Sequence, residues 1–325
     1  MNRLVTVATG LLIVLGGAAI STGAIAQNRL TIATGGAAGV YHPLGNAMAK
    51  VLGSYLPDTT AGNEATSASA DNIRRIVAGS VQVAFTQADT AWDAFKGYGA
   101  FQNAGPQPIR TIAVLYPNSL QLVTTANSGI NKVSDLRGKR VSTGAKGSGT
   151  EIWGYRLLEA SGIDPKKDIN DIKLGIGPSA ADLKSGKLDA LVWSGGIPTK
   201  AIADLANDPT VQVKLVNTAA AVISMLRKYG PVYTDGEIVA NAYKGVSRDT
   251  PVAQVWNLLV VRADADEKLV YDIVKTLFDH KPELIAGHKA ATEMELRTQA
   301  RGGSPIPFHN GAKKFYRENG VRILR

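Results

Sequence analysis

The chain has 325 residues, of which 45% are hydrophobic, and this is enough for a large domain or for two moderate lobes. It contains no cysteine, which excludes disulfides, cysteine nucleophiles and thiolate metal sites. The formal net charge of +9 could steer anionic ligands towards the protein, or it could be a solvated basic surface without a specific role. We see no compact run of Lys and Arg with interleaved aromatic residues, so nucleic acid is not an expected partner.

Residues 1–26 are expected to be a signal peptide. Arg3 gives a positive start, residues 4–20 are almost wholly apolar, and Ala24-Ile25-Ala26 has the small-x-small pattern of a cleavage site. The mature chain would then begin at Gln27 and be exported. An uncleaved anchor is the alternative, because the apolar run approaches the length that spans a bilayer.

The mature chain repeats one local pattern twice. A short strand at 30–33 precedes a glycine-rich turn, and a helix is predicted to begin at Pro43. A second short strand at 140–142 precedes the glycine-rich segment 143–150, and a helix follows to about Ala160. Proline suits the first helical position, and the glycines Gly53 and Gly162 suit helix C-termini.

A second pair of segments strengthens this repeat. Ser69 opens an amphipathic helix that closes at Gly79 and leads into a strand over 81–85. Ser179 opens a shorter helix that leads into a strand over 188–193. Two strand–helix units in the same order and at nearly the same spacing favour two similar α/β lobes over a single long sheet.

The connections between the lobes are predicted from two similar β-rich segments, 120–127 and 257–264. If each is a crossover hinge strand, residues 27–120 and 262–325 form lobe one, and residues 121–261 form lobe two. The segment after Asp266 has a helical pattern to about His280 and again to Gln299, followed by an irregular loop and a short terminal helix. The predicted fold class is therefore α/β, with two lobes and a ligand cleft between them.

The candidate site follows from a rule for open α/β sheets, in which ligands bind beyond the carboxyl ends of the strands. Two loops from each lobe would meet there, and their glycines, hydroxyls and free N–H groups could cradle a carboxylate while aromatic side chains form the walls. Simple turn chemistry and helix capping are the alternative, and Asp89 in particular suits a helix N-terminus. The predicted ligand-binding residues are Gly36, Gly39, Tyr41, Ser69, Gln87, Asp89, Tyr116, Gly147, Ser148, Gly149, Thr150, Trp193 and Ser194.

Enzyme patterns are not found. In the loop that most resembles a phosphate-binding loop, Thr150 follows Gly149 where the phosphate-binding lysine belongs. The sequence has no H-E-x-x-H and no G-x-S-x-G, and its four histidines show no metal-ligand spacing. We therefore expect a binding protein without a metal or cofactor, and not an enzyme.

The loops and their flanks resemble the TAXI family (TRAP-associated extracytoplasmic immunogenic proteins), the solute-binding subunits of one class of TRAP transporter. The matching segments cover essentially the whole mature chain: 31–36, 39–45, 73–89, 115–117, 135–142, 147–151, 259–264 and 305–309. The resemblance implies a periplasmic protein that closes on a small anion, such as glutamate, glutamine or 2-oxoglutarate, and docks to TRAP membrane subunits. One segment departs from the family's usual Thr-Gly-Gly-Ser, because residues 66–69 read Thr-Ser-Ala-Ser.

Several alternatives stay open at this stage. Asp89 or Glu151 could receive the α-ammonium of an amino acid, whereas a keto acid would leave them without a cationic partner. The same fold could serve a sensor instead of a transporter. It could also carry an enzyme, since a fold does not fix a function.

Overall fold

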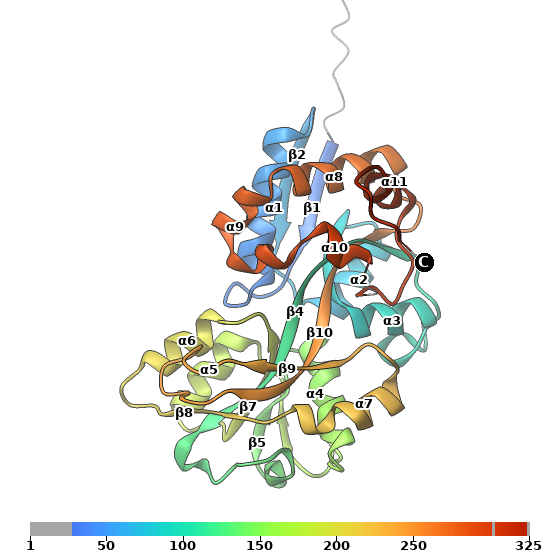
Figure 1. Ribbon diagram of the computed structural model, residues 1–325. Coiled ribbons are helices and arrows are strands. Elements are labelled where there is room, and N and C mark those ends of the chain that lie inside the picture. Colours follow the sequence, from blue (N-terminus) through green and yellow to red (C-terminus); the bar gives the residue numbers. More distant parts are fainter. Residues whose placement is uncertain (1–27, 301–302, 324–325) are drawn as a thin grey trace, which may run out of the picture.

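The computed structural model describes residues 28–300 and 303–323, so the predicted signal peptide lies outside the described residues. The chain forms two α/β lobes joined by two long strands, β4 (Ile109–Thr125) and β10 (Thr250–Arg262), which lie antiparallel side by side (Figure 1). The prediction of a two-lobed α/β fold is confirmed.

Lobe one is the upper lobe in Figure 1. Its parallel strands are β1 (Asn28–Ala33), β2 (Thr59–Glu64) and β3 (Val83–Gln87), and β10 pairs antiparallel with β3. The helices of this lobe come from both ends of the chain: α1 (Tyr41–Tyr55), α2 (Ser69–Val77), α3 (Ala88–Lys96), α8 (Glu267–Asp279), α9 (Lys281–Gly287), α10 (Leu296–Ala300) and α11 (Asn310–Glu318).

Lobe two is the lower lobe in Figure 1. Its parallel strands are β5 (Arg140–Ser142), β6 (Asn170–Ile172) and β7 (Ala190–Gly195), and β4 pairs antiparallel with β7. Strand β8 (Val213–Val216) pairs with β4, and β9 (Thr234–Ile238) pairs with β10. The helices are α4 (Gly149–Ala160), α5 (Ile176–Lys184), α6 (Lys200–Asn207) and α7 (Val222–Tyr229).

The two crossover strands connect the hydrogen-bonded ladders of both lobes. The ladder runs β2-β1-β3-β10-β4-β7-β5-β6, so one continuous path passes through both lobes. On β4 the pairing with β7 begins at Ser119, and on β10 the partner changes from β9 at residues 250–254 to β3 at residues 257–260. The lobe boundaries near 120 and 262 stay a prediction, and these pairings favour a change of lobe on β10 a few residues earlier.

The predicted elements differ from the structure by a few residues at their ends, and α1 runs past Gly53 to Tyr55, so the prediction of a helix C-terminus at Gly53 is wrong. Helix α1 begins at Tyr41 instead of Pro43, and α5 begins at Ile176 instead of Ser179. Strands β3 and β7 each begin two residues later than predicted. Val81 and Leu188 are buried although they precede the ladder, so their apolar side chains pack in the core without strand pairing. The apolar sequence pattern therefore predicted both strands about two residues too early.

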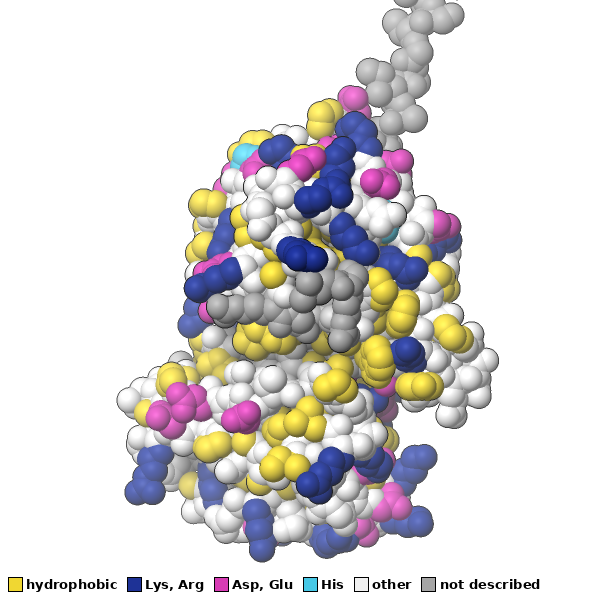
Figure 2. Space-filling model, turned by 45° about the vertical axis from the view of Figure 1, so that its right-hand side comes forward, with side chains coloured by type: hydrophobic (Ala, Val, Ile, Leu, Met, Phe, Trp, Pro, Cys, Tyr) yellow, Lys and Arg dark blue, Asp and Glu magenta, His cyan; other side chains and the backbone are white. Residues whose placement is uncertain are grey.

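The basic side chains are distributed over the surface. On the face shown in Figure 2, Lys and Arg side chains are scattered over both lobes among acidic ones and do not form one patch. Among the described residues, no helix combines the length and the apolar character needed to cross a membrane.

Candidate functional site

A cavity of about 150 Å³ lies between the lobes, where the loops after β1, β3, β5 and β7 meet. Both lobes line it, as the sequence rule predicted. The predicted site residues that line the cavity are Gly36, Gly39, Tyr41, Ser69, Gln87, Tyr116, Ser148, Gly149, Thr150, Trp193 and Ser194. The remaining lining residues were not predicted: Gly35, Val40, Thr66, Ser67, Ala68, Asn118, Ala145, Gly175, Ile176 and Gly195.

Helix N-termini from both lobes converge on the cavity. The first residue and the N-cap of α1, α2, α4 and α5 all belong to the lining, and so does Gln87, the N-cap of α3. In α4 the N–H groups of Gly149 and Thr150 have no hydrogen-bond partner within the described part of the chain. Free N–H groups and aligned peptide dipoles make a helix N-terminus attractive to anions.

The side chains of the lining carry no charge. None of the described residues that face the cavity is Asp, Glu, Lys, Arg or His. Among the residues that face the cavity, the groups that attract an anion are therefore main-chain N–H groups and helix dipoles. Such a cavity favours an anion without forming an ion pair.

Three buried polar atoms in the lining have no hydrogen-bond partner among the described residues: Gln87 Oε1, the Tyr116 hydroxyl and Asn118 Oδ1. The amide nitrogens of Gln87 and Asn118 both donate to the Ser194 hydroxyl, the latter at 3.1 Å, and this leaves the two amide oxygens free. An unpaired buried polar group costs about 1–3 kcal/mol. A ligand that pairs with these atoms recovers that free energy.

The Tyr116 hydroxyl stays protonated in this environment. Burial raises the pKa of Tyr116 well above its ordinary value, and the neighbouring Tyr41 adds to the effect. The second tyrosine of the lining, Tyr41, is already paired, because its hydroxyl donates to Asn257 Oδ1 at 2.5 Å. Tyr116 is thus free to hydrogen-bond to a ligand, and Tyr41 fixes the wall.

We therefore expect Tyr116→Phe to reduce ligand affinity about tenfold, the effect of losing one hydrogen bond of about 1.4 kcal/mol. The ligand-free variant should be no less stable than the wild type, because the hydroxyl that is removed has no partner. Tyr41→Phe is the matched control. Its ligand affinity should stay close to that of the wild type, and its stability should fall because the bond to Asn257 is lost. Thermal denaturation and titration calorimetry on the two variants separate these results, and a Tyr116→Phe protein with unchanged affinity would contradict the assignment.

The cradle at the start of α4 is held by its own side chains. Ser148 is the N-cap and accepts from the Glu151 N–H at 3.0 Å. The Glu151 carboxylate accepts from the Gly147 N–H at 2.6 Å and pairs with Lys173 at 3.1 Å. Gly147, a predicted site residue, does not line the cavity. With a φ of +81° it turns the chain, and its carbonyl accepts from the Asp71 N–H of lobe one at 3.3 Å.

Asp89, a predicted site residue, also lies outside the cavity lining. The side chain is fully buried, and its carboxylate accepts from the Tyr233 hydroxyl at 2.8 Å and pairs with Arg156. Nor is it the N-cap of α3, which is Gln87. Asp89 is already matched by groups of the protein, so it offers no free charge to an ammonium group.

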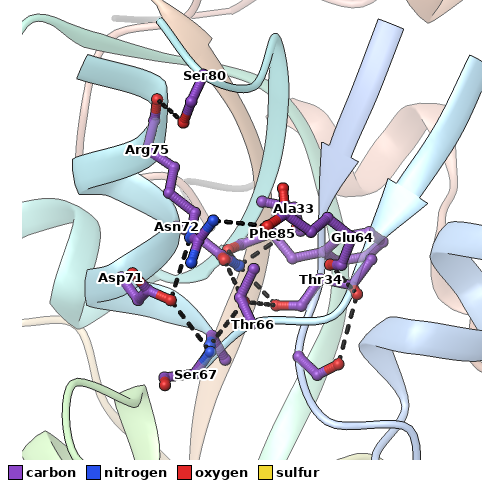
Figure 3. A network of polar contacts seen from close by, with 12 residues as sticks. Ala33, Thr34, Glu64, Thr66, Ser67, Asp71, Asn72, Arg75, Ser80 and Phe85 are labelled. Atoms are coloured by element: carbon purple, nitrogen blue, oxygen red, sulfur yellow. Dashed lines mark hydrogen bonds and ion pairs between the residues drawn. The ribbon is translucent and has the colours of Figure 1, made fainter. Parts of the chain in front are cut away.

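Asn72 fixes the lobe-one side of the cavity (Figure 3). Its amide nitrogen lies within hydrogen-bond distance of the carbonyl oxygens of Thr34 at 2.6 Å and Phe85 at 2.8 Å, and its oxygen accepts from the Thr66 hydroxyl. One side chain on α2 therefore ties together the end of β1, the middle of β3 and the lining residue Thr66. The sequence comparison singled out the segment 66–69, but it did not reveal this role.

The segment 66–69 contains a strained residue. Ala68, the N-cap of α2, has φ +70° and ψ −161°, a conformation that is essentially reserved for glycine. This is one of the two positions where the TAXI pattern has glycine and this chain does not. Strain of this kind costs about 1–3 kcal/mol and tends to occur at functional sites.

The lobes, the crossover strands and the cavity between them define the fold of periplasmic solute-binding proteins. The chain belongs to the NMT1-like family, whose model matches residues 32–320. A solved structure described as a periplasmic transporter is 13% identical, with a TM-score of 0.52 over 91% of this chain and 93% of that one. The putative L-cystine ABC transporter from Listeria monocytogenes is 16% identical, with a TM-score of 0.50 over 82% and 98%. The aliphatic sulphonate binding protein SsuA from Escherichia coli is 17% identical, with a TM-score of 0.47 over 90% and 83%.

Proposed function

We propose that this protein captures a small carboxylate in the periplasm for uptake through a TRAP transporter, and that it catalyses no reaction. The observation that carries the proposal is the convergence of helix N-termini on a cavity whose lining has no charged side chain. The family and the fold support solute binding. The TRAP partner and the exported location rest on the resemblance to TAXI proteins and on the predicted signal peptide.

The size of the cavity limits the ligand. An engineered protein cavity of about 150 Å³ binds benzene, so a ligand of roughly six to ten non-hydrogen atoms fits this site. Glutamate, glutamine and 2-oxoglutarate fall at the upper end of this range.

The unpaired atoms refine the choice among these acids. Gln87 Oε1 and Asn118 Oδ1 are acceptors, so they require a hydrogen-bond donor on the ligand. Glutamate and glutamine supply such a donor in their ammonium group, and 2-oxoglutarate does not. We therefore propose that a carboxylate lies at the start of α4 while a donor group of the same ligand faces Gln87 and Asn118.

A thermal-shift screen tests this proposal. The mature protein, freed of co-purified ligand, is mixed with glutamate, glutamine, 2-oxoglutarate, succinate, succinamide and ethanesulfonate. A ligand at a hundredfold excess over its Kd raises the apparent stability by about 2.7 kcal/mol. We expect the largest shift with glutamate or glutamine and none with the neutral succinamide.

Each other outcome removes a defined part of the proposal. If 2-oxoglutarate gives a larger shift than either amino acid, the ligand needs no donor group facing Gln87 and Asn118, and the proposal of a carboxylate ligand stands. If ethanesulfonate alone gives a shift, the site binds anions but the proposal of a carboxylate ligand is overturned. No shift with any anion overturns the proposed ligand class, and conversion of a bound acid to a product would revive an enzymatic function.

A further inference from the structure

A buried cluster of charges lies outside the cavity and bridges the two lobes. Asp89 and Asp93 lie on α3 of lobe one, and Arg156 lies on α4 of lobe two. Their exposed fractions are 0%, 3% and 9%. None of the three lines the cavity, so this cluster has no part in the ligand contacts described above.

The contacts within the cluster join the lobes directly. Arg156 Nη2 donates to Asp93 Oδ2, and Arg156 Nη1 lies 3.5 Å from Asp89 Oδ2. Tyr233, which precedes β9 in lobe two, accepts from Arg156 Nη1 at 2.7 Å and donates to Asp89 Oδ2 at 2.8 Å. Two carboxylates of one lobe thus share a cation of the other lobe, and one of them, Asp89, also accepts from a hydroxyl of that lobe.

Aromatic rings of lobe two pack around this cluster. The guanidinium of Arg156 lies over the Tyr229 ring, 4.6 Å from its centroid, and Trp153 stacks on Tyr233. Burial raises the pKa of Asp93, and Arg156 opposes the rise. Burial alone would lower the pKa of Arg156, but Tyr233, Asp89 and Asp93 raise it above its ordinary value, so the cation persists.

Replacing the charged residue of one lobe leaves the buried charges of the other lobe without a partner. Removal of one partner of a buried ion pair is strongly destabilising, because the remaining charge stays desolvated. Here the remaining charges belong to the other lobe, and water reaches them again when the lobes separate. Loss of Arg156 therefore acts on the balance between open and closed lobes more than on the fold of either lobe.

We infer that Arg156, Asp89, Asp93 and Tyr233 form a latch that stabilises the closed arrangement of the lobes and thereby sets ligand affinity from outside the cavity. These are positioning residues. The latch differs from the interlobe contact of Gln87 with Ser194, which lies in the cavity lining. The inference does not depend on the identity of the ligand.

The absence of cysteine allows a direct test without any ligand. Lys50 on α1 and Lys187 after α5 are exposed, and the two residues lie in different lobes. The Lys50→Cys/Lys187→Cys protein, spin-labelled at both positions, reports the distance between the lobes. In this background we expect a measurable closed population, and Arg156→Met should lower the closed-to-open ratio at least about tenfold, equivalent to 1.4 kcal/mol.

Further variants separate the latch from general destabilisation. Tyr233→Phe removes a single hydroxyl and should shift the ratio in the same direction by about threefold, equivalent to about 0.65 kcal/mol. Arg140→Met is the matched control, because the partner of Arg140, Asp189, lies in the same lobe. It should leave the distance distribution unchanged.

The inference is overturned if the labelled background shows no closed population. It is also overturned if folded Arg156→Met and Tyr233→Phe proteins keep the distribution of the control. Since no ligand is present, neither result bears on the proposed carboxylate, and failure of the ligand screen would leave this measurement unaffected.

Discussion

Gly149→Ala is expected to reduce ligand affinity by about a hundredfold, towards the upper end of the 1–3 kcal/mol range for overpacking. A Cβ at Gly149 would lie 2.5 Å from Ser69 Oγ and 2.7 Å from Gln87 Cδ. Both neighbours belong to lobe one, whereas Gly149 begins α4 of lobe two. The added methyl group therefore holds the lobes apart.

The same substitution should not weaken the fold. Gly149 is helical, and alanine is a better helix former than glycine. The ligand-free variant is thus expected to be at least as stable as the wild type, because separation of the lobes relieves the clash. Calorimetric titration with the acid found in the screen, combined with thermal denaturation, measures both properties.

Gly53→Ala is the control for this prediction. Gly53 also lies in a helix, but its Cβ would approach the nearest atom, Ala61 N, only to 3.6 Å, an ordinary contact. Its affinity should equal that of the wild type. If Gly149→Ala binds as tightly as Gly53→Ala, the close approach of the lobes at Gly149 is not part of the bound state.

Asn72→Ala should lower the free energy of unfolding by about 3 kcal/mol, because several buried hydrogen bonds are lost at once. The fully buried Asn72 side chain donates to the carbonyl oxygens of Thr34 and Phe85 and accepts from the Thr66 hydroxyl. Alanine removes these bonds and leaves a small space between α2 and the strands, although the Thr66 hydroxyl can still donate to the Thr34 carbonyl, at 3.1 Å. Chemical denaturation monitored by circular dichroism measures the loss.

Asn131→Ala provides the comparison for Asn72. Asn131 is exposed, and its side-chain contacts lie at the surface of lobe two. A change within about 0.5 kcal/mol is expected there. Equal effects of the two substitutions would show that the network in Figure 3 does not support lobe one.

The two-lobed fold could be predicted because the sequence repeats a strand, a glycine-rich turn and a helix in the same order. Such a unit has one natural place for a ligand, at the carboxyl ends of its strands. The loops at Gly36 and Gly149 were found in this way, and both line the cavity. Local patterns were sufficient here because each loop belongs to a single strand–helix unit.

Contacts between distant segments could not be predicted. Asp89 and Arg156 are 67 positions apart, and their pairing depends on how α3 packs on α4 across the two lobes. Asp89 therefore looked like a free carboxylate beside the site. Asn118 was missed as well, although a polar residue within the apolar strand β4 is a signal that could have drawn attention to it.

The neutral lining also determines which protons can accompany binding. Tyr41 and Tyr116 are its titratable side chains among the described residues, and burial raises the pKa of each above the ordinary value. Neither hydroxyl ionises near neutral pH, and peptide N–H groups do not titrate in this range. Any proton taken up or released on binding must come from the ligand itself or from groups outside the cavity. The pH of the surroundings would then determine which protonation form of the solute is captured, while the cavity lining stays the same.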